Sequence, residues 1–265
     1  MKILIDQLGT IYNFEKPPSR IISLVPSQTE LLFDLGLEES IIGITKFCIH
    51  PKHFLKEKVK IGGTKNVNFE KIKSLNPDII IANKEENTQK IVEELSIICP
   101  VWVTNIITIQ DNLKMIYDFG ELFEKQVIAQ NWINKIEIGL TNFKIFIKNQ
   151  PIQKVAYFIW AKPYMVAGNN NFINEMLKLN KFENVFQNQE RYPEIEIEKM
   201  QSETNVELIL LSSEPFPFKE NHKVEIQQFV KEAKIILVDG ELFSWYGSRI
   251  IKAFDYFKVL NSKIN

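Results

Sequence analysis

The stretch Asp78-Ile79-Ile80-Ile81-Ala82 decides the fold that this chain predicts. After Asp78 it is a short, uninterrupted apolar run, which is typical of a strand buried on both faces of a parallel sheet. The residues before it, 69–74, read Phe-Glu-Lys-Ile-Lys-Ser and have the spacing of a short amphipathic helix. We therefore predict a short helix followed by a buried strand in this part of the chain.

The same pattern occurs a second time, 128 residues further along. Residues 197–202 read Ile-Glu-Lys-Met-Gln-Ser and precede Glu207-Leu208-Ile209-Leu210. The two copies differ by one residue in the connecting turn. A repeat at this distance indicates two similar lobes, because the repeats of a solenoid follow one another at 20–50 residues.

Strand and helix patterns alternate around both copies. In the first half, strands are predicted at 21–25, 41–44 and 101–103, and helices at 29–35 and 87–95. In the second half, strands are predicted at 155–160, 208–211 and 235–238, and helices at 172–179, 224–233 and 250–260. This alternation predicts an α/β fold with parallel sheets.

A different pattern separates the two halves. Residues 122–148 contain no proline and carry apolar residues at helical spacing, until Pro151 ends the stretch. We predict one long backbone helix here, weakened slightly by Gly139. The predicted organisation is an N-terminal α/β lobe (1–121), a backbone helix (122–149) and a C-terminal α/β lobe (150–265), with a ligand cleft between the lobes.

Composition and charge narrow the possible functions. The chain has 265 residues, 45% of them hydrophobic, and a formal net charge of −1. Such a balance does not supply the positive field that nucleic-acid binding requires, so no nucleic-acid partner is predicted. Cys48 and Cys99 are too few for a disulfide framework, and their pairing is left open.

Few residues suggest catalysis or a metal centre. The sequence has no phosphate-binding Gly-rich loop and no GxSxG motif, and it contains three histidines. We therefore predict a protein that is not an enzyme and has no intrinsic cofactor. The cluster Cys48, His50 and His53 is a weak candidate for a divalent metal, while His50 alone could face the cleft as a metal ligand or hydrogen-bond donor.

Aromatic residues gather in the loops that follow predicted strands, where they could form a surface for a large, flat, partly apolar ligand. Arg249 would suit a carboxylate, phosphate or amide group on such a ligand. The predicted ligand-binding set is Pro26, Ser27, Phe47, His50, Trp160, Tyr164, Phe243, Trp245, Tyr246 and Arg249.

The segment 20–32, Arg-Ile-Ile-Ser-Leu-Val-Pro-Ser-Gln-Thr-Glu-Leu-Leu, resembles the opening of the cobalamin-binding proteins of ABC importers. Further segments resemble the same family in the same order: Gly43-Ile44-Thr45, Gly62-Gly63-Thr64-Lys65, Pro77-Asp78-Ile79-Ile80, Ala167-Gly168, Glu183-Asn184-Val185-Phe186 and Arg191-Tyr192-Pro193-Glu194. The resemblance covers nearly the whole chain. It implies two α/β lobes on a rigid helix and a binding role, with a corrinoid as the ligand and an ABC permease as the partner.

The resemblance also implies roles for the two glutamates of the repeat. In this family a glutamate on each lobe docks onto arginines of the permease, and the matching residues are Glu70 and Glu198. The chain departs from the family where relatives often carry tryptophans, at Thr64 and Asn83, and where Glu241-Leu242-Phe243 replaces an Asp-Trp-Phe stretch. A monomer is expected.

Two alternatives stay open at this point. The first is an iron-siderophore or haem receptor of the same fold, although only Arg20, Arg191 and Arg249 could meet an anionic chelate. The second is a cytoplasmic protein that is not linked to a permease. It would be either an enzyme or a protein that binds a corrinoid or another metal complex. The family resemblance implies a periplasmic location. Asp6 and Gln7 interrupt the apolar stretch of a signal peptide, which predicts a cytoplasmic location if Met1 is the native start.

Overall fold

The computed structural model describes residues 2–264, which divide into two compact units. Unit 1 contains the chain up to Glu137 together with Trp245–Ile250, and unit 2 contains Ile138–Ser244 together with the chain from Ile251 onward. This division differs from the predicted boundaries after residues 121 and 149. The long helix contributes to both units, and a short segment near the C-terminus returns to unit 1.

Unit 1 is built on a parallel sheet. Its strand order is β5 (Val59–Lys60), β4 (Ile41–Ile44), β3 (Ile21–Ser23), β6 (Ile79–Asn83) and β7 (Val101–Thr104). Each neighbouring pair is parallel. Strands β3, β6 and β7 are buried at every residue, as strands are when both faces of a parallel sheet are covered. The prediction of a buried strand at 78–82 is confirmed.

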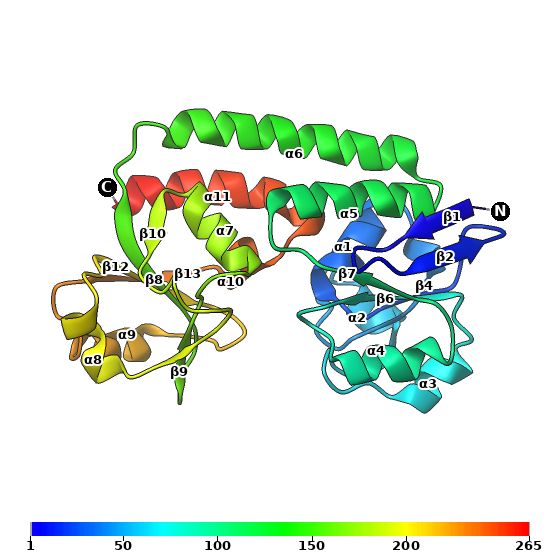
Figure 1. The fold of residues 1–265 in the computed structure, drawn as a ribbon, viewed down its shortest axis with the longest axis horizontal. Coiled ribbons are helices and arrows are strands. Elements are labelled where there is room, and N and C mark those ends of the chain that lie inside the picture. Colours follow the sequence, from blue (N-terminus) through cyan, green and yellow to red (C-terminus); the bar gives the residue numbers. More distant parts are fainter. Residues whose placement is uncertain (1, 265) are drawn as a thin grey trace. The chain divides into compact units, whose positions relative to one another are not determined.

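Helices and a hairpin complete unit 1. The helices are α1 (Pro26–Asp34), η1 (Glu38–Ser40), α2 (Phe54–Glu57), α3 (Phe69–Ser74), α4 (Gln89–Ser96), α5 (Ile109–Leu122) and η2 (Gly247–Arg249). An antiparallel hairpin, β1 (Lys2–Ile5) and β2 (Ile11–Phe14), was not predicted and is drawn in dark blue in Figure 1. Pro26 is the first residue of α1, where its missing N–H has no cost, so the helix starts three residues before the predicted 29.

The carboxylate of Asp78 connects the residues that precede two neighbouring strands of this sheet, β3 and β6. The Asp78 carboxylate accepts hydrogen bonds from the backbone N–H of Ser19 (2.9 Å), the Ser19 hydroxyl (3.0 Å) and the backbone N–H of Arg20 (3.1 Å). Burial alone would raise the pKa of Asp78, but these hydrogen bonds outweigh burial and lower it. Asp78 therefore joins the start of β6 to the start of β3.

Unit 2 has a mixed sheet. Its strand order is β11 (Glu194–Ile195), β9 (Tyr164–Val166), β8 (Gln153–Trp160), β12 (Leu208–Ser212) and β13 (Lys234–Val238), and β10 (Phe182–Asn184) also pairs with β8. Strands β8, β12 and β13 pair in parallel, as predicted, and β10, which was not predicted, pairs in parallel with β8. The antiparallel strands β9 and β11 were not predicted, because each is too short to show a pattern.

The helices of unit 2 are α7 (Phe172–Leu179), α8 (Ile197–Glu203), α9 (Glu220–Gln227), α10 (Gly240–Ser244) and most of α11 (Ile250–Ile264). Helix α9 was predicted at 224–233 but lies earlier in the chain. Its start is fixed by His222, whose Nδ1 accepts a hydrogen bond from the backbone N–H of Lys219 (3.0 Å). Apolar residues 229, 230 and 233, which extended the predicted helix, lie beyond its end.

The internal repeat is confirmed as a repeat of topology. Helix α3 leads into β6, which lies between β3 and β7, and helix α8 leads into β12, which lies between β8 and β13. The order β4-β3-β6-β7 of unit 1 corresponds to β10-β8-β12-β13 of unit 2, with parallel pairing throughout. The two units are therefore similar α/β lobes.

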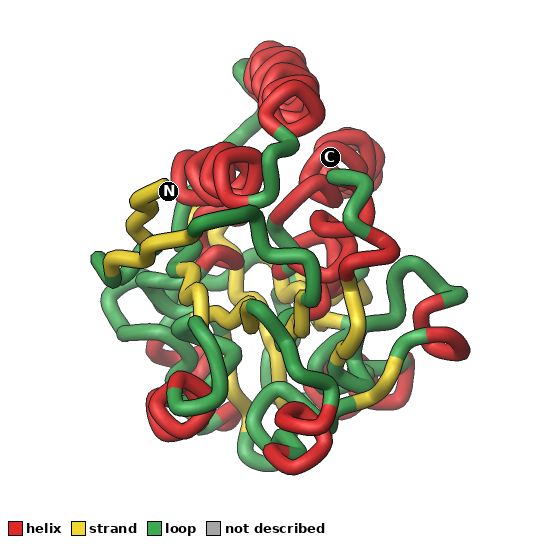
Figure 2. Tube along the Cα trace, turned by 90° about the vertical axis from the view of Figure 1, so that its right-hand side faces the viewer, coloured by secondary structure: helices red, strands yellow, loops and turns green. Residues whose placement is uncertain are grey.

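One long helix, α6 (Gln126–Ile147), runs without interruption in Figure 1 and is seen nearly end-on in Figure 2. It was predicted to begin at residue 122, but α5 ends there and Glu124 adopts a positive φ of 54°. Gly120 allows the two helices to approach closely, because a Cβ at this position would lie 2.6 Å from that of Ala129. Within residues 2–264 no helix has both the length and the apolar character of a membrane span.

Gly139 has a packing role that the sequence did not reveal. A Cβ built on Gly139 would lie 2.7 Å from Cδ2 of Phe254 in α11. The Phe254 ring is buried and stacks on Phe143, with ring centroids 6.1 Å apart. The residue expected to weaken the helix is therefore the one that lets α6 and α11 pack closely within unit 2.

Candidate ligand-binding surfaces

Buried polar side chains meet at the carboxyl ends of β6 and β7 in unit 1. Gln28 Nε2 donates to Thr104 Oγ1 (2.5 Å) and to the Tyr246 hydroxyl (3.2 Å). Asn83 Nδ2 also donates to Thr104 Oγ1 (3.1 Å). Because these groups are buried and bonded to one another, they hold α1, two strand ends and the segment around residue 246 in a fixed arrangement.

Cys48 belongs to a second buried polar cluster of unit 1. Its Sγ lies 3.1 Å from Thr29 Oγ1 and 3.2 Å from Thr45 Oγ1, and Thr29 Oγ1 donates to Ser23 Oγ (2.8 Å). Burial raises the pKa of the Cys48 thiol, and burial together with the Asp78 carboxylate raises that of Cys99 to about 12. Both cysteines are free, which resolves the pairing that the sequence left open.

Arg249 is paired inside unit 1, and this contradicts the prediction that it is available to a ligand. Its Nε donates to Glu30 Oε2 (2.6 Å) and its Nη2 to Glu30 Oε1 (3.0 Å), and both side chains are buried. The guanidinium also lies over the Trp245 ring, 5.0 Å from its centre. A buried carboxylate requires a counter-charge, so the planar guanidinium is fixed by Glu30.

The aromatic residues around 245 are also less accessible than expected. Phe243 is 0% exposed in helix α10 of unit 2, and its ring packs on Tyr157 (4.9 Å) and Phe257 (4.8 Å). In unit 1, Trp245 (8% exposed) and Tyr246 are buried, and burial raises the pKa of Tyr246. The expectation of an exposed aromatic loop is wrong here because each ring finds a covered position within its own unit. Phe243 is a core residue.

The accessible part of the predicted set in unit 1 lies in the loop after β4. The Phe47 ring is 48% exposed, and Lys46 Nζ lies 5.0 Å from its centre. The His50 ring is partly exposed and contacts the edge of Trp245, with centroids 5.6 Å apart. Pro26 is partly exposed and Ser27 is buried. The accessible surface of these residues therefore consists mainly of Phe47 and His50.

Unit 2 has an aromatic cluster around Trp160, which is 40% exposed at the end of β8. Its ring contacts Phe216 (5.7 Å), which contacts Phe218 (4.8 Å) and His222 (5.2 Å). Phe216 and His222 were not among the predicted site residues. The signal that could have identified Phe216 is the Phe-Pro-Phe sequence at 216–218, which begins four positions after the last residue of the buried strand β12.

Tyr164 lies on β9 of the same unit. Its hydroxyl donates to Glu225 Oε1 (2.9 Å), and burial followed by this hydrogen bond raises its pKa to about 12. Its ring also meets the edge of Phe158 (5.8 Å). Tyr164 is thus a neutral, oriented, partly exposed aromatic side chain.

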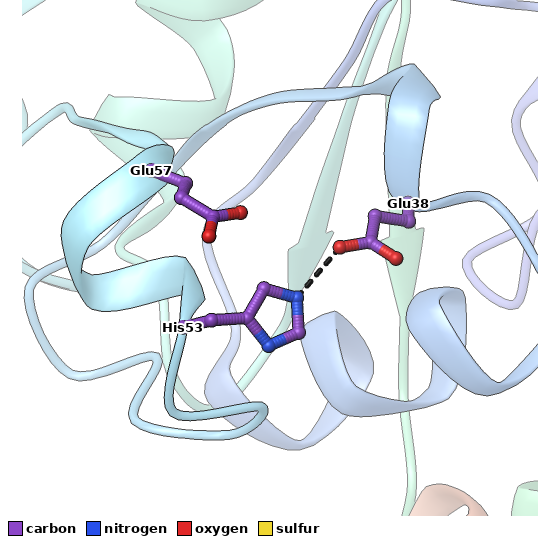
Figure 3. Close-up of side chains that lie close together, drawn as sticks. All are labelled: Glu38, His53 and Glu57. Atoms are coloured by element: carbon purple, nitrogen blue, oxygen red, sulfur yellow. Dashed lines mark hydrogen bonds and ion pairs between the residues drawn. The ribbon is translucent and has the colours of Figure 1, made fainter.

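The three weak metal candidates do not come together. Cys48 is enclosed by threonine hydroxyls, and His50 contacts Trp245. His53 Nε2 lies 2.6 Å from Glu38 Oε1 instead. Within residues 2–264 the only group of three or more metal-ligating side chains is Glu38, His53 and Glu57 (Figure 3). Glu38 and Glu57 were missed because they lie on either side of the predicted Cys48, His50 and His53 set in the sequence and form no recognisable motif with it.

Glu70 and Glu198 occupy equivalent positions. Each is the second residue of its short helix, α3 or α8, and each is exposed. A carboxylate in the first turn of a helix interacts favourably with the helix dipole, which explains these residues without any partner. Their shared place in the repeat nevertheless puts one exposed carboxylate at the same point of each unit.

The described chain thus consists of two similar α/β units, and each of them carries exposed aromatic rings. A family model described as periplasmic binding protein matches residues 21–242. The chain belongs to this family.

Its relatives include binding proteins of known ligand. The chain is 28% identical over 189 residues to the Vitamin B12-binding protein of Vibrio parahaemolyticus, covering 70% of this chain and 68% of that protein. It is also 28% identical over 175 residues to an uncharacterized ABC transporter substrate-binding lipoprotein, YvrC, of Bacillus subtilis, covering 62% and 54%. One of these relatives is thus named for binding Vitamin B12, and the other for binding the substrate of an ABC transporter.

Solved structures share the fold. The periplasmic Vitamin B12 binding protein BtuF of Vibrio cholerae superposes with a TM-score of 0.79 at 18% identity, covering 93% of this chain and 98% of that one. The periplasmic heme-binding protein RhuT of Roseiflexus sp. RS-1 gives 0.80 at 16% identity, covering 92% and 98%. The fold is therefore common to receptors of different ligands.

Proposed function

We propose that this protein is the substrate-binding protein of an ABC importer and that its ligand is cobalamin or a related corrinoid. The observation that carries the proposal is the match to a Vitamin B12-binding protein over 70% of the chain. The protein binds and delivers its ligand without transforming it.

The residues of each unit support a ligand that is large and partly apolar. Phe47 and His50 of unit 1, and Trp160 and Tyr164 of unit 2, present accessible aromatic surface. Aromatic rings gain free energy by covering flat apolar groups, and His50 and Tyr164 add polar atoms at their edges. We assign the ligand contacts to these four side chains.

The arginines weigh against an anionic siderophore. Arg249 is held by Glu30, and Arg20 donates from Nε to the backbone oxygen of Asn76 (2.9 Å). Recognition of an anionic chelate favours clustered guanidinium groups. A heme or iron-siderophore ligand is the alternative, favoured by the fold shared with a heme-binding protein.

Isothermal titration with cyanocobalamin, haem and a ferric siderophore tests the proposal. We expect saturable binding of cyanocobalamin with one ligand per chain. Binding of haem or the siderophore in place of cyanocobalamin would transfer the assignment to the alternative. Absence of binding to all three would overturn the receptor proposal itself.

Variants locate the ligand contacts. Replacing Phe47 or Trp160 by alanine should weaken cyanocobalamin binding about two- to tenfold, because one aromatic contact contributes about 0.5–1.5 kcal/mol beyond area burial. Tyr117, an exposed aromatic residue of α5, provides the matched control, and Tyr117→Ala should leave the affinity unchanged. Equal losses in all three variants would contradict the assignment.

Glu70 and Glu198 are proposed to dock the protein onto arginines of its permease outside the cytoplasmic membrane. Glu70→Ala and Glu198→Ala should preserve ligand affinity and reduce ligand-dependent stimulation of the permease in proteoliposomes. Glu232→Ala, which changes an exposed glutamate outside the two repeat helices, is the control. Altered ligand affinity, or unchanged stimulation, would contradict the docking role.

A further inference from the structure

Glu38, His53 and Glu57 form a cluster on unit 1 that the proposed receptor function does not use (Figure 3). One potential ligand atom from each side chain lies within 4.8 Å of the other two. We propose that this cluster is a binding site for a divalent transition-metal ion of the Zn²⁺ type. One imidazole nitrogen and two carboxylate oxygens are the donors that such an ion accepts.

The local structure brings the three donors together. His53 is the residue before α2 and Glu57 is its last residue, so the two are four positions apart, a spacing that places helical side chains on one face. Glu38 begins η1, on a separate segment. Its backbone oxygen accepts a hydrogen bond from Lys58 Nζ (2.7 Å), which joins η1 to the end of α2.

Aromatic neighbours fix the orientation of the imidazole. The His53 ring meets Phe54 with centroids 5.0 Å apart and Phe33 at 5.7 Å, both in edge-to-face geometry. Its Nε2 points to Glu38 Oε1 at 2.6 Å, and Figure 3 shows the Glu57 carboxylate facing the imidazole from the end of α2. An oriented imidazole loses less conformational freedom when it binds an ion.

Charge and accessibility also suit a cation. Two carboxylates and a neutral imidazole carry a charge of −2, which a divalent ion balances. The Lys58 ammonium donates to the backbone oxygen of Glu38 and not to a carboxylate of the cluster. The His53 and Glu38 side chains are 40% and 38% exposed and Glu57 is exposed, so water can complete the coordination. A metal would take the place of the proton between His53 Nε2 and Glu38 Oε1.

Titration of the chelator-treated full-length chain with Zn²⁺ tests this site. We expect one saturable site per chain. His53→Gln and Glu57→Gln should each weaken Zn²⁺ binding by more than about tenfold, because even the loss of an outer-shell partner of a metal ligand costs 10- to 100-fold. Glu57→Gln leaves the hydrogen bond between His53 and Glu38 intact, so it removes a ligand without disturbing the pair.

His222→Gln is the matched control, because His222 is a partly exposed histidine of unit 2. It should retain wild-type affinity, and circular dichroism should show that all variants remain folded. X-ray absorption of the Zn²⁺ complex should show nitrogen and oxygen ligands and no sulfur. Non-saturable binding, sulfur ligation, or unchanged affinity in both His53→Gln and Glu57→Gln would overturn the proposal.

Discussion

Substitutions in the ion pair between Arg249 and Glu30 can test whether Arg249 stabilises the fold or binds the ligand. Two hydrogen bonds, of 2.6 and 3.0 Å, join the two side chains, and the side chains are 8% and 9% exposed. Hydrogen bonds to charged groups contribute about 1.5–3 kcal/mol each, which gives about 3–6 kcal/mol for the pair. This agrees with the roughly 3–5 kcal/mol lost when one partner of a buried pair is removed.

We therefore expect Glu30→Gln to lower the free energy of unfolding by about 3 kcal/mol or more. The glutamine keeps the shape of the side chain but leaves a buried guanidinium without its counter-charge. Arg249→Met should cost a similar amount, while its side chain still covers the Trp245 ring. Unfolding in urea, followed by circular dichroism, measures both changes.

The double variant Glu30→Met/Arg249→Met provides the control. It contains neither charge, so its loss of stability should be far smaller than the sum of the two single losses. Additive losses, or a change below about 1 kcal/mol in Glu30→Gln, would refute the structural role. A stable Arg249→Met protein with strongly reduced cyanocobalamin affinity would restore Arg249 to the ligand-binding set.

Three further predictions concern stability. Gly139→Ala should destabilise unit 2 by about 1–3 kcal/mol in spite of the better helix propensity of alanine, because the added Cβ meets the Phe254 ring. The control Asn142→Ala, on the exposed face of α6, should be neutral or stabilising. If thermal unfolding showed that Gly139→Ala stabilises the protein, this packing would be contradicted. Gly247→Ala should cost about 1–2 kcal/mol by urea unfolding, because φ is +83° there, and a neutral effect would show that the segment relaxes. The pKa of the Asp78 carboxyl in the folded protein lies below its unfolded value of about 4. Its contribution to stability is therefore present above that pH and is lost as the pH falls through the folded pKa. Asp78→Asn should make the free energy of unfolding less dependent on pH in the acid range, and an unchanged pH dependence would argue against this role.

The sequence predicted most of the parallel framework because long apolar runs are strong signals. Residues 78–82 and 208–211 could be interpreted as buried strands without knowledge of their neighbours, and the repeat around them matched the topology. The short antiparallel strands β9 and β11, the hairpin β1–β2 and the short strands β5 and β10 were missed. Most of them are only partly buried, unlike the fully buried strands that the sequence revealed.

Side-chain accessibility was harder to predict than the fold. Phe47 and Trp160 are exposed, and Phe243 is in the core, although all three lie at or beyond the end of a strand in the sequence. Arg249 was assigned to a ligand because its partner, Glu30, is 219 residues away in the chain. Which rings are covered, and which charges are paired, depends on such distant contacts, and local sequence patterns do not contain them.

The division of the chain has a consequence for how the protein is made and dissected. The backbone passes between units after residues 137, 244 and 250, so unit 1 contains a piece synthesised after almost all of unit 2. A fragment that stops before Trp245 lacks the guanidinium that neutralises Glu30, the backbone of Gly247 that bonds Asn112, and the Tyr246 hydroxyl that meets Gln28. During translation unit 1 therefore gains its last segment, Trp245–Ile250, only after most of unit 2 has been made, and its N-terminal part expressed alone would lack these three contacts.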